Sequence, residues 1–264
     1  MTAYQQAVVD GSRVFYREAG AKDRPTILLL HGFPTSSHMF RNLIPALADR
    51  YHLVAPDLPG FGFSGAPDRK QFRYNFDNLA KVVDRFTQTI GIDRYALYIF
   101  DYGAPVGLRL ALAHPERITA IISQNGNAYE EGLSQGWNPI QKYWKEPTAE
   151  NRAALREFLT PEATKSQYLY GVTNATLVAP EAYALDSALL ARSLWCKQVV
   201  SGTASDVFQF VVCRVVSCRV VEFCSCITDG ELPGPRTAKK QEKQASLRGF
   251  STPAACPRPS AGAG

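Results

Sequence analysis

The sequence predicts an α/β fold, in which a mostly parallel sheet is covered by helices on both faces. Short apolar runs rich in β-branched and aromatic residues alternate with segments whose apolar residues recur at helical spacing. The chain is long enough, at 264 residues with 45% hydrophobic content, to bury a large core. From residue 128 the strand pattern stops, and aromatic helical segments follow to about residue 191.

The first elements are the clearest. Tyr4–Val9 and Arg13–Glu18 alternate β-formers around Asp10-Gly11, a residue pair that favours the tight turn of a hairpin. Asn75 or Asp77 is placed to cap the amphipathic helix that is expected at about Asn78–Thr89. The later strands are expected at Thr26–Leu30, Tyr51–Ala55, Tyr95–Phe100 and Ala120–Ser123. Helices are expected at about Met39–Ala48, Asn78–Thr89 and Val106–Ala113.

Three parts are expected along the chain: a core at residues 1–127, a partial helical cap at 128–194, and a tail at 195–264 that is partly disordered. The cap is expected to cover the carboxyl edge of the sheet. The tail differs in composition from the body, because it is rich in Lys, Gln, Pro, Ala and Gly and holds all six cysteines. A valine-rich segment within it, Val207–Ile227, has the composition of a strand.

Composition argues against several partners. The net charge is +5, but most of the excess lies in the tail, so the near-neutral body gives no reason to expect nucleic acid. The N-terminus has no secretory pattern, and three charged residues interrupt Val207–Ile227, so no membrane span is expected. A body without cysteine fits a reducing compartment, and we expect a cytoplasmic protein. The oligomeric state is left open.

The cysteine spacing does not favour a metal. One interpretation is a zinc site, but the spacings match no zinc knuckle and no histidine is near. A disulfide framework is not expected without secretion. We therefore expect no metal. The cysteines of the zinc interpretation are Cys213, Cys218, Cys224 and Cys226.

Asp101 is the leading candidate for chemistry. It stands where the apolar strand of Ala96–Phe100 breaks into a helix, and Gly103 supplies the small neighbour that such a turn needs. Ile99, two residues before Asp101, should crowd the turn. A carboxylate there is already ionised and would attack an sp3 carbon to give an alkyl ester. The alternative is a helix N-cap, a common role for Asp.

Three motifs in order carry a resemblance to a known family. They are HGFP at 31–34, DLPGFGFS at 57–64 and FDYGAPVG at 100–107, followed by the aromatic cap. Together they resemble the epoxide hydrolase and dehalogenase branch of the α/β-hydrolases, over about residues 1–194. The resemblance implies an α/β-hydrolase fold, a small apolar substrate, no cofactor, and hydrolysis of an epoxide or a carbon–halogen bond.

The resemblance also assigns roles to residues. Asp101 would be the nucleophile, the N–H groups of Phe33 and Tyr102 would form the oxyanion hole, and His31 would be structural. Haloalkane dehalogenases commonly have Asn and Trp where this chain has Phe33 and Tyr102, which favours epoxides or small haloacids. Cap side chains would bind substrate, and tyrosines among them would protonate a leaving oxygen, although packing is the alternative for each. These candidates are Tyr143, Trp144, Tyr168 and Tyr170.

The chain departs from the family after the cap. The family completes its site with a later acid and a histidine that activates water, but this chain has no histidine after His114, and Asn125 stands where some members have the acid. We expect a fold truncated at its last strands, from truncation, mis-splicing or a frameshift, and an enzyme that is inactive or limited to a single turnover. The alternative is a non-catalytic remnant. The lack of an elbow serine argues against an esterase.

Overall fold

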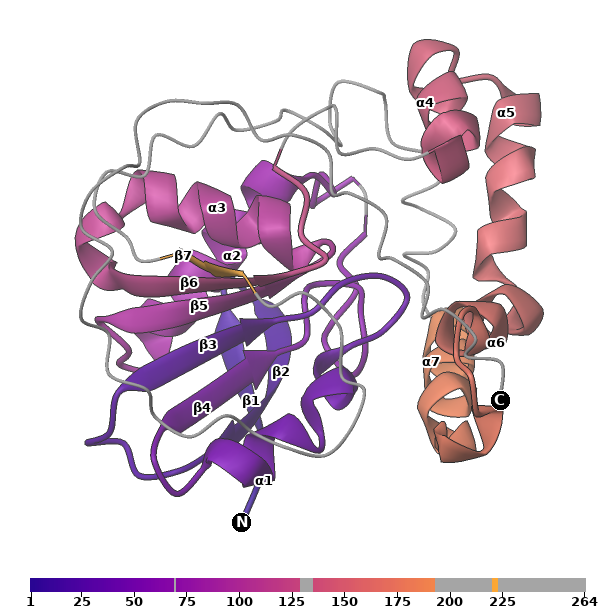
Figure 1. The fold of residues 1–264 in the computed structure, drawn as a ribbon. Coiled ribbons are helices and arrows are strands. Elements are labelled where there is room, and N and C mark those ends of the chain that lie inside the picture. The colour runs from indigo at the N-terminus through magenta and orange to yellow at the C-terminus, as the bar shows by residue number, and fades with distance from the viewer. Residues whose placement is uncertain (69, 129–134, 193–219, 223–264) are drawn as a thin grey trace, which may run out of the picture. The chain divides into compact units, whose positions relative to one another are not determined.

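The structure, a computed structural model, describes residues 1–68, 70–128, 135–192 and 220–222 (Figure 1). These residues form a seven-stranded sheet in the order β1-β2-β4-β3-β5-β6-β7. The first two strands form an antiparallel hairpin, β2 pairs antiparallel with β4, and the remaining pairs are parallel, which confirms the predicted sheet. The strands are β1 (Ala3–Val9), β2 (Ser12–Ala19), β3 (Thr26–Leu30), β4 (His52–Pro56), β5 (Tyr95–Phe100), β6 (Ile118–Gln124) and β7 (Val220–Glu222).

Helices cover the core sheet on both faces, as the alternation along β3 requires (Figure 1). Leu28 and Leu30 point into a cluster formed with α2 and α3, whereas Ile27 and Leu29 pack with the first helical turns on the other face. Strand residues of β3 are therefore buried from both sides. The core helices are η1 (Ser37–Phe40), α1 (Leu43–Leu47), α2 (Phe76–Thr89), α3 (Gly103–Ala113) and η2 (Pro115–Arg117).

Local signals explain where the first elements turn and begin. Asp10 and Gly11 both have positive φ, 48° and 77°, which matches the hairpin turn that this pair predicts. Asn75 rather than Asp77 caps α2, because its Oδ1 accepts the N–H of Asn78 at 2.8 Å. Asp77 lies in the first turn of the helix, where its negative charge interacts favourably with the helix dipole.

The helix expected at about Met39–Ala48 is two shorter elements in the structure. The 3-10 helix η1 ends at Phe40, and α1 begins only at Leu43. Pro45 explains the break, because proline lacks the N–H that would bond the carbonyl four residues back and its ring clashes with that carbonyl. Proline is tolerated only in the first turn, which is where α1 places it.

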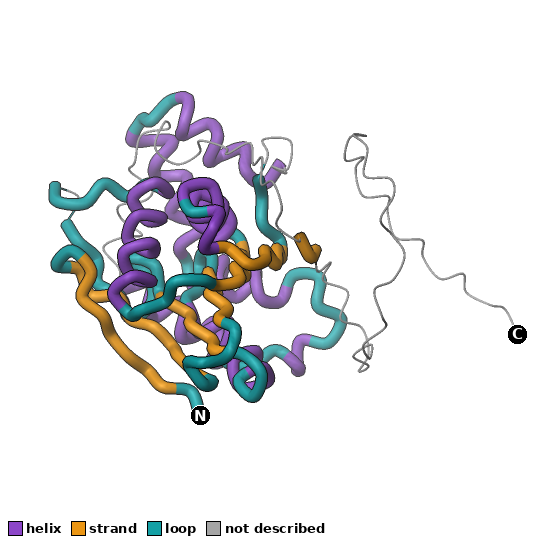
Figure 2. Tube along the Cα trace, turned by 90° about the vertical axis from the view of Figure 1, so that its left-hand side faces the viewer, coloured by secondary structure: helices purple, strands orange, loops and turns teal. Residues whose placement is uncertain are grey.

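Residues 135–192, which lie in the predicted cap, are helical and contain no strand. Figure 2 draws these helices, like those of the core, in purple. A small apolar cluster around Tyr143 and Leu155 holds the first cap helices together. The cap elements are η4 (Gln135–Trp137), α4 (Asn138–Lys145), α5 (Ala149–Ala154), η5 (Leu155–Leu159), α6 (Pro161–Leu169), η6 (Ala175–Leu177) and α7 (Pro180–Arg192).

Little of the tail belongs to the described residues. Of the expected strand segment Val207–Ile227, only Val220–Glu222 is described, and it pairs in parallel with β6. The four cysteines of the zinc interpretation and the disorder expected in 195–264 lie outside the described residues. The boundaries proposed for core, cap and tail remain predictions.

Candidate active site

Asp101 occupies a strained turn between β5 and α3. Its φ of +46° lies in the left-handed region that non-glycine residues rarely adopt. The turn is fixed from both sides, because Tyr95–Phe100 is paired into the sheet and the N–H of Ala104 bonds the carbonyl of Asp101 at 2.9 Å. The carboxylate is thereby presented at the carboxyl edge of the sheet, where ligands of α/β folds bind.

Two backbone N–H groups hold the carboxylate. The N–H of Phe33 donates to Oδ1 of Asp101 at 2.7 Å, and the N–H of Tyr102 donates to the same carboxyl group. Burial of the carboxyl group raises its pKa from 3.8 to about 6, although both hydrogen bonds act in the opposite direction. The donors that the resemblance assigns to an oxyanion hole therefore lie around this carboxylate.

Glycines provide the space in which this geometry forms. A side chain at Gly32 would collide with Asp101, and one at Gly103 would collide with the carbonyl of Leu30. Ile99, which was expected to crowd the turn, has room because Gly107 has no side chain to meet it. The small residues around the turn are thus matched to the large side chain inside it.

Aromatic rings surround the residue that follows the carboxylate. Tyr102 contacts Phe61 and Phe76 in edge-to-face geometry, with ring centroids 6.1 Å and 5.2 Å apart. Phe33 lies 6.1 Å from the same ring. These contacts fix the position of Tyr102 and give the site an apolar wall.

Asp57 connects the segment 57–64 to the segment 31–37. Its Oδ1 accepts the N–H of Ser37 at 2.7 Å, and its Oδ2 accepts the N–H of Phe63 at 2.8 Å. Asp57 is fully buried, and these bonds satisfy both of its oxygens. The segment 57–64 thereby holds the segment 31–37, which explains why both motifs are needed to build one site.

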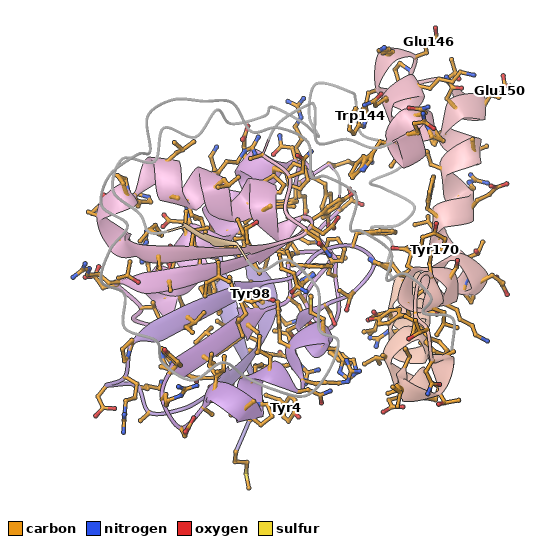
Figure 3. The ribbon with its side chains drawn as sticks, in the orientation of Figure 1. Tyr4, Tyr98, Trp144, Glu146, Glu150 and Tyr170 are labelled. Carbon is orange, nitrogen blue, oxygen red and sulfur yellow. The ribbon has the colours of Figure 1, made fainter. Side chains whose placement is uncertain are left out.

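The cap candidates occupy different environments. Tyr143 is buried in the small cap cluster, and Trp144 packs against that cluster from α4 (Figure 3). Tyr170 is 89% exposed just after α6. No contact between these three side chains and Asp101 is found among the described residues. Their role as substrate-binding residues remains a prediction.

Tyr168 has a specific polar partner in the cap. Its hydroxyl donates to Oδ2 of Asp186 at 2.5 Å, and burial raises the pKa of the phenol. Sequence reasoning missed Asp186, and it also missed Thr35, whose hydroxyl lies beside both groups. The available signal was an acid on an otherwise apolar helix face, since Ala182, Leu189 and Leu190 flank it at helical spacing.

All four histidines of the chain are described, and the first two have structural partners. His31 is fully buried, with Nδ1 beside the carbonyl of Gly32 at 2.9 Å and Nε2 accepting the N–H of Leu58 at 2.9 Å. This is the structural role that the resemblance implied. His38 has Nδ1 3.3 Å from the guanidinium of Arg17, and burial lowers its pKa to about 4, helped by neighbouring arginines.

The other two histidines lie away from the candidate carboxylate. His52 is buried between Glu18, at 2.8 Å from Nε2, and Thr26, at 3.1 Å from Nδ1. His114 ends α3 and lies 3.4 Å from Asp84. None of the four imidazoles is hydrogen-bonded to Asp101. The expected position of an acid after β6 is Asn125, which is exposed.

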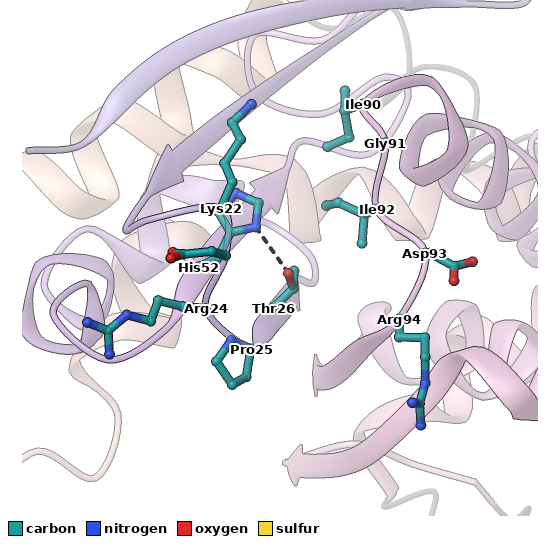
Figure 4. Close-up of a pocket in the computed structure, with 11 residues that line it drawn as sticks. Lys22, Arg24, Pro25, Thr26, His52, Ile90, Gly91, Ile92, Asp93 and Arg94 are labelled. Atoms are coloured by element: carbon teal, nitrogen blue, oxygen red, sulfur yellow. Dashed lines mark hydrogen bonds between the residues drawn. The ribbon is translucent and has the colours of Figure 1, made fainter.

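A cavity lies at the edge of the sheet opposite Asp101. About 460 Å³ in volume, it is lined by Thr26, His52 and the segment Ile90–Arg94, at the amino ends of β3, β4 and β5 (Figure 4). Its charged side chains splay away from the centre in Figure 4. The described residues contain no cluster of three metal-binding side chains, and no described helix is long and apolar enough to cross a bilayer.

The fold places the chain in a known protein family. The family model described as the alpha/beta hydrolase fold matches residues 25–167. The chain belongs to the α/β-hydrolase fold family. Over 190 residues it is 50% identical to an uncharacterized hydrolase of Saccharomyces cerevisiae, covering 70% of this chain and 65% of the relative.

Dehalogenases are among its homologues. A haloalkane dehalogenase of Bradyrhizobium diazoefficiens is 36% identical over 163 residues, covering 60% of this chain and 50% of the relative. The solved haloalkane dehalogenase of Bradyrhizobium elkani is 25% identical, with a TM-score of 0.62, and the match covers 78% of this chain and 72% of that structure. The chain therefore spans between half and two thirds of the length of the two curated relatives.

Proposed function

We propose that Asp101 is the nucleophile of a hydrolase that attacks epoxides or carbon–halogen bonds. In this chain the reaction stops after the first step, the formation of an alkyl ester on Asp101. The observation that carries this proposal is the Asp101 carboxylate itself, held on a strained turn by the N–H groups of Phe33 and Tyr102. A helix N-cap needs neither the positive φ nor a donor from a segment 68 residues away.

The first step forms an ester bond between an oxygen of Asp101 and an sp3 carbon. The bond that breaks is carbon–halogen, which releases halide, or carbon–oxygen, which opens an epoxide and leaves an alkoxide that takes up a proton. Orientation of the attacking oxygen supplies much of the acceleration, and the N–H donors provide it. Raising the pKa of the carboxyl group also makes its conjugate base more nucleophilic.

The second step requires a base to activate water at the ester. The surroundings of the four histidines support a block at this point, because no imidazole is hydrogen-bonded to Asp101 in the described structure. Nε2 of His38 has no partner there, but it is buried. The same N–H donors would stabilise the oxyanion of this step, by about 3–4 kcal/mol for one good donor. Without a base, the ester accumulates.

The leaving group divides the two substrate classes. Halide needs no proton, which suits a structure in which the hydroxyl of Tyr168 donates to Asp186 and Tyr170 faces solvent. The kinship with haloalkane dehalogenases also favours halides. Phe33 and Tyr102, in place of Asn and Trp, favour epoxides or small haloacids. Both classes therefore belong in one test panel.

Intact mass spectrometry tests the proposal directly. The purified chain is incubated with short 1-haloalkanes, haloacids and monosubstituted epoxides, and we expect one equivalent of alkyl adduct on the peptide that contains Asp101. Hydroxylamine should release it, because it cleaves esters. Asp101→Asn should form none.

Three outcomes contradict the proposal. Sustained turnover would mean that another group activates water. The absence of any adduct across the panel would favour the second candidate, a non-catalytic remnant in which the site is not assembled. An adduct that persists in Asp101→Asn would place the nucleophile elsewhere.

A further inference from the structure

One cap helix contacts the loops that carry the candidate site. Asp186, Leu189 and Leu190 of α7 line a cavity with Pro34–Ser36 and Gly60–Gly62. The cavity measures about 10 Å³, close to the space of a single water. This helix is therefore packed directly on the segment that begins one residue after Phe33.

Asp186 is a buried carboxylate that the proposed chemistry does not use. The residue is 1% exposed, on a helix face whose other members are apolar. Its Oδ2 accepts the hydroxyl of Tyr168 at 2.5 Å, whereas its Oδ1 has no hydrogen-bond partner among the described residues. Burying a carboxylate is costly unless it is paired and hydrogen-bonded.

The groups around Asp186 come from both the cap and the core. Burial raises its pKa to about 6, while the hydroxyls of Tyr168 and Thr35 and the charge of Arg41 oppose this shift. Asp57 adds to it by repulsion. At neutral pH the carboxylate is thus mostly ionised, faced by two hydroxyls and one cation.

The segment Pro34–Ser36 lies between Asp57 and Asp186, and it follows the residue whose N–H bonds Asp101. On its core side, the N–H of Ser37 is held by Asp57. On its cap side, Thr35 lines the small cavity together with Asp186. Its hydroxyl donates to the carbonyl of Ser36 at 3.4 Å and lowers the pKa values of Tyr168 and Asp186. The segment is therefore held at two points, and the residue immediately before Pro34 is the one whose N–H bonds the nucleophile.

We propose that Asp186, acting through Tyr168 and Thr35, is a positioning residue that fixes Pro34–Ser36 and so directs the N–H of Phe33 onto the Asp101 carboxylate. The kinetic part of this inference rests on the proposed function, but its structural part does not. On this proposal, helix α7 orients the nucleophile through the segment Pro34–Ser36.

The structural part is tested on the full chain by NMR. With [15N]phenylalanine labelling, the Phe33 amide is assigned by Phe33→Tyr and followed from pH 4 to 8. We expect its proton to titrate with Asp101, and to move upfield in Tyr168→Phe and Asp186→Asn, because the hydrogen bond lengthens. Tyr183→Phe, on α7 beside Tyr168, is the matched control and should leave the amide unchanged.

The kinetic part uses the alkylation rate at saturating electrophile. Tyr168→Phe and Asp186→Asn should each slow alkylation about tenfold, with little change in the concentration that gives half the maximal rate. Loss of substrate contacts would change that concentration instead. Should Asp186→Asn fail to fold, Thr35→Val against Thr35→Ser provides the same comparison, since only the first removes the hydroxyl.

The outcomes separate this inference from the proposed function. An unchanged Phe33 amide in both variants overturns the positioning role, whatever the kinetics. An equal shift in Tyr183→Phe also overturns it, because general cap packing would then be the cause. A shifted amide in a chain that forms no adduct supports the positioning role and contradicts the proposed function.

Discussion

A single carboxylate, Asp101, combines properties that usually oppose each other. Burial disfavours its ionised form, yet only that form can attack carbon. The donors at Phe33 and Tyr102 limit the penalty by bonding the ionised form. The result is a carboxylate that is ionised at neutral pH but close to its titration range.

This position predicts the pH dependence of alkylation. The rate should be constant above about pH 7 and should fall as pH decreases through about 6, approaching tenfold per pH unit, because protonation removes the attacking species. Single-turnover rates between pH 4.5 and 8, with Asp101→Asn as the inactive reference, give the profile. A rate that is flat between pH 5 and 7 contradicts the assignment.

Gly32 offers a steric test of the same geometry. In Gly32→Ala the new methyl group would collide with Asp101, so the carboxylate must move. We expect alkylation to slow about a hundredfold, the scale of a displacement of about 1 Å at a reacting group. The matched control is Gly65→Ala, where the methyl meets only ordinary contacts. Equal rates in the two variants would show that Asp101 tolerates the shift.

At the residue scale, the sequence predicted what depends on local pattern. Asp101 and the turn around it follow from neighbours in the chain, and the Phe33 N–H follows from a motif. Asp186 was missed because its partner is 18 residues earlier and its other neighbour, Thr35, is in the core. Such a pairing is set by tertiary packing, which no local pattern encodes.

At the scale of elements, strands were predicted more closely than helix ends. Thr26–Leu30 and Tyr95–Phe100 have the predicted bounds because they are buried, β-prone and ended by turn residues. Helix α3 begins at Gly103, three residues earlier than expected, because its first turn contains Pro105, which the first turn of a helix tolerates. Apolar periodicity locates a helix, whereas its ends depend on individual residues.

Arg117 connects these elements and predicts a large loss of stability. Its buried guanidinium donates to Asp84 on α2 at 2.6 Å, to Thr87 on the same helix, and to the carbonyls of Ile92 and Asp93 before β5. Removing it leaves a partly buried charge and several acceptors without partners. We expect Arg117→Ala to lower the free energy of unfolding by about 3–5 kcal/mol, measured in urea.

The exposed pair of Arg85 and Asp10 gives the matched control. Their side chains are 58% and 53% exposed, so Arg85→Ala should cost no more than about 1 kcal/mol. A similar loss in both variants would mean that the Arg117 network contributes little beyond a surface ion pair. The comparison also removes the general effect of deleting an arginine.

Across the whole molecule, the buried carboxyls link stability to pH. Asp101 and Asp186 both have pKa values raised from 3.8 to about 6, so the folded chain binds more protons than the unfolded chain between these values. Their contribution to stability is fully present below about pH 4 and is lost as pH rises through 6. A shift of about two units corresponds to about 3 kcal/mol for each group.

Asp186→Asn should remove the pH-dependent contribution of this carboxyl group to stability. Relative to wild type, the variant should gain free energy of unfolding as pH rises from 4 to 7, by an amount on the order of 3 kcal/mol at most. Urea titrations at each pH give the difference, and Asp49→Asn, at a 75% exposed side chain, is the control. A difference that does not vary with pH contradicts the raised pKa.

None of the four histidines is hydrogen-bonded to Asp101, and this has a consequence for the quantity of substrate the chain can remove. On the proposed chemistry each molecule consumes one electrophile and is then spent. Its capacity therefore equals its copy number, and protection of a cell would scale with synthesis of the protein rather than with time. Such a chain would act as a stoichiometric scavenger, and the population of alkylated molecules would record past exposure.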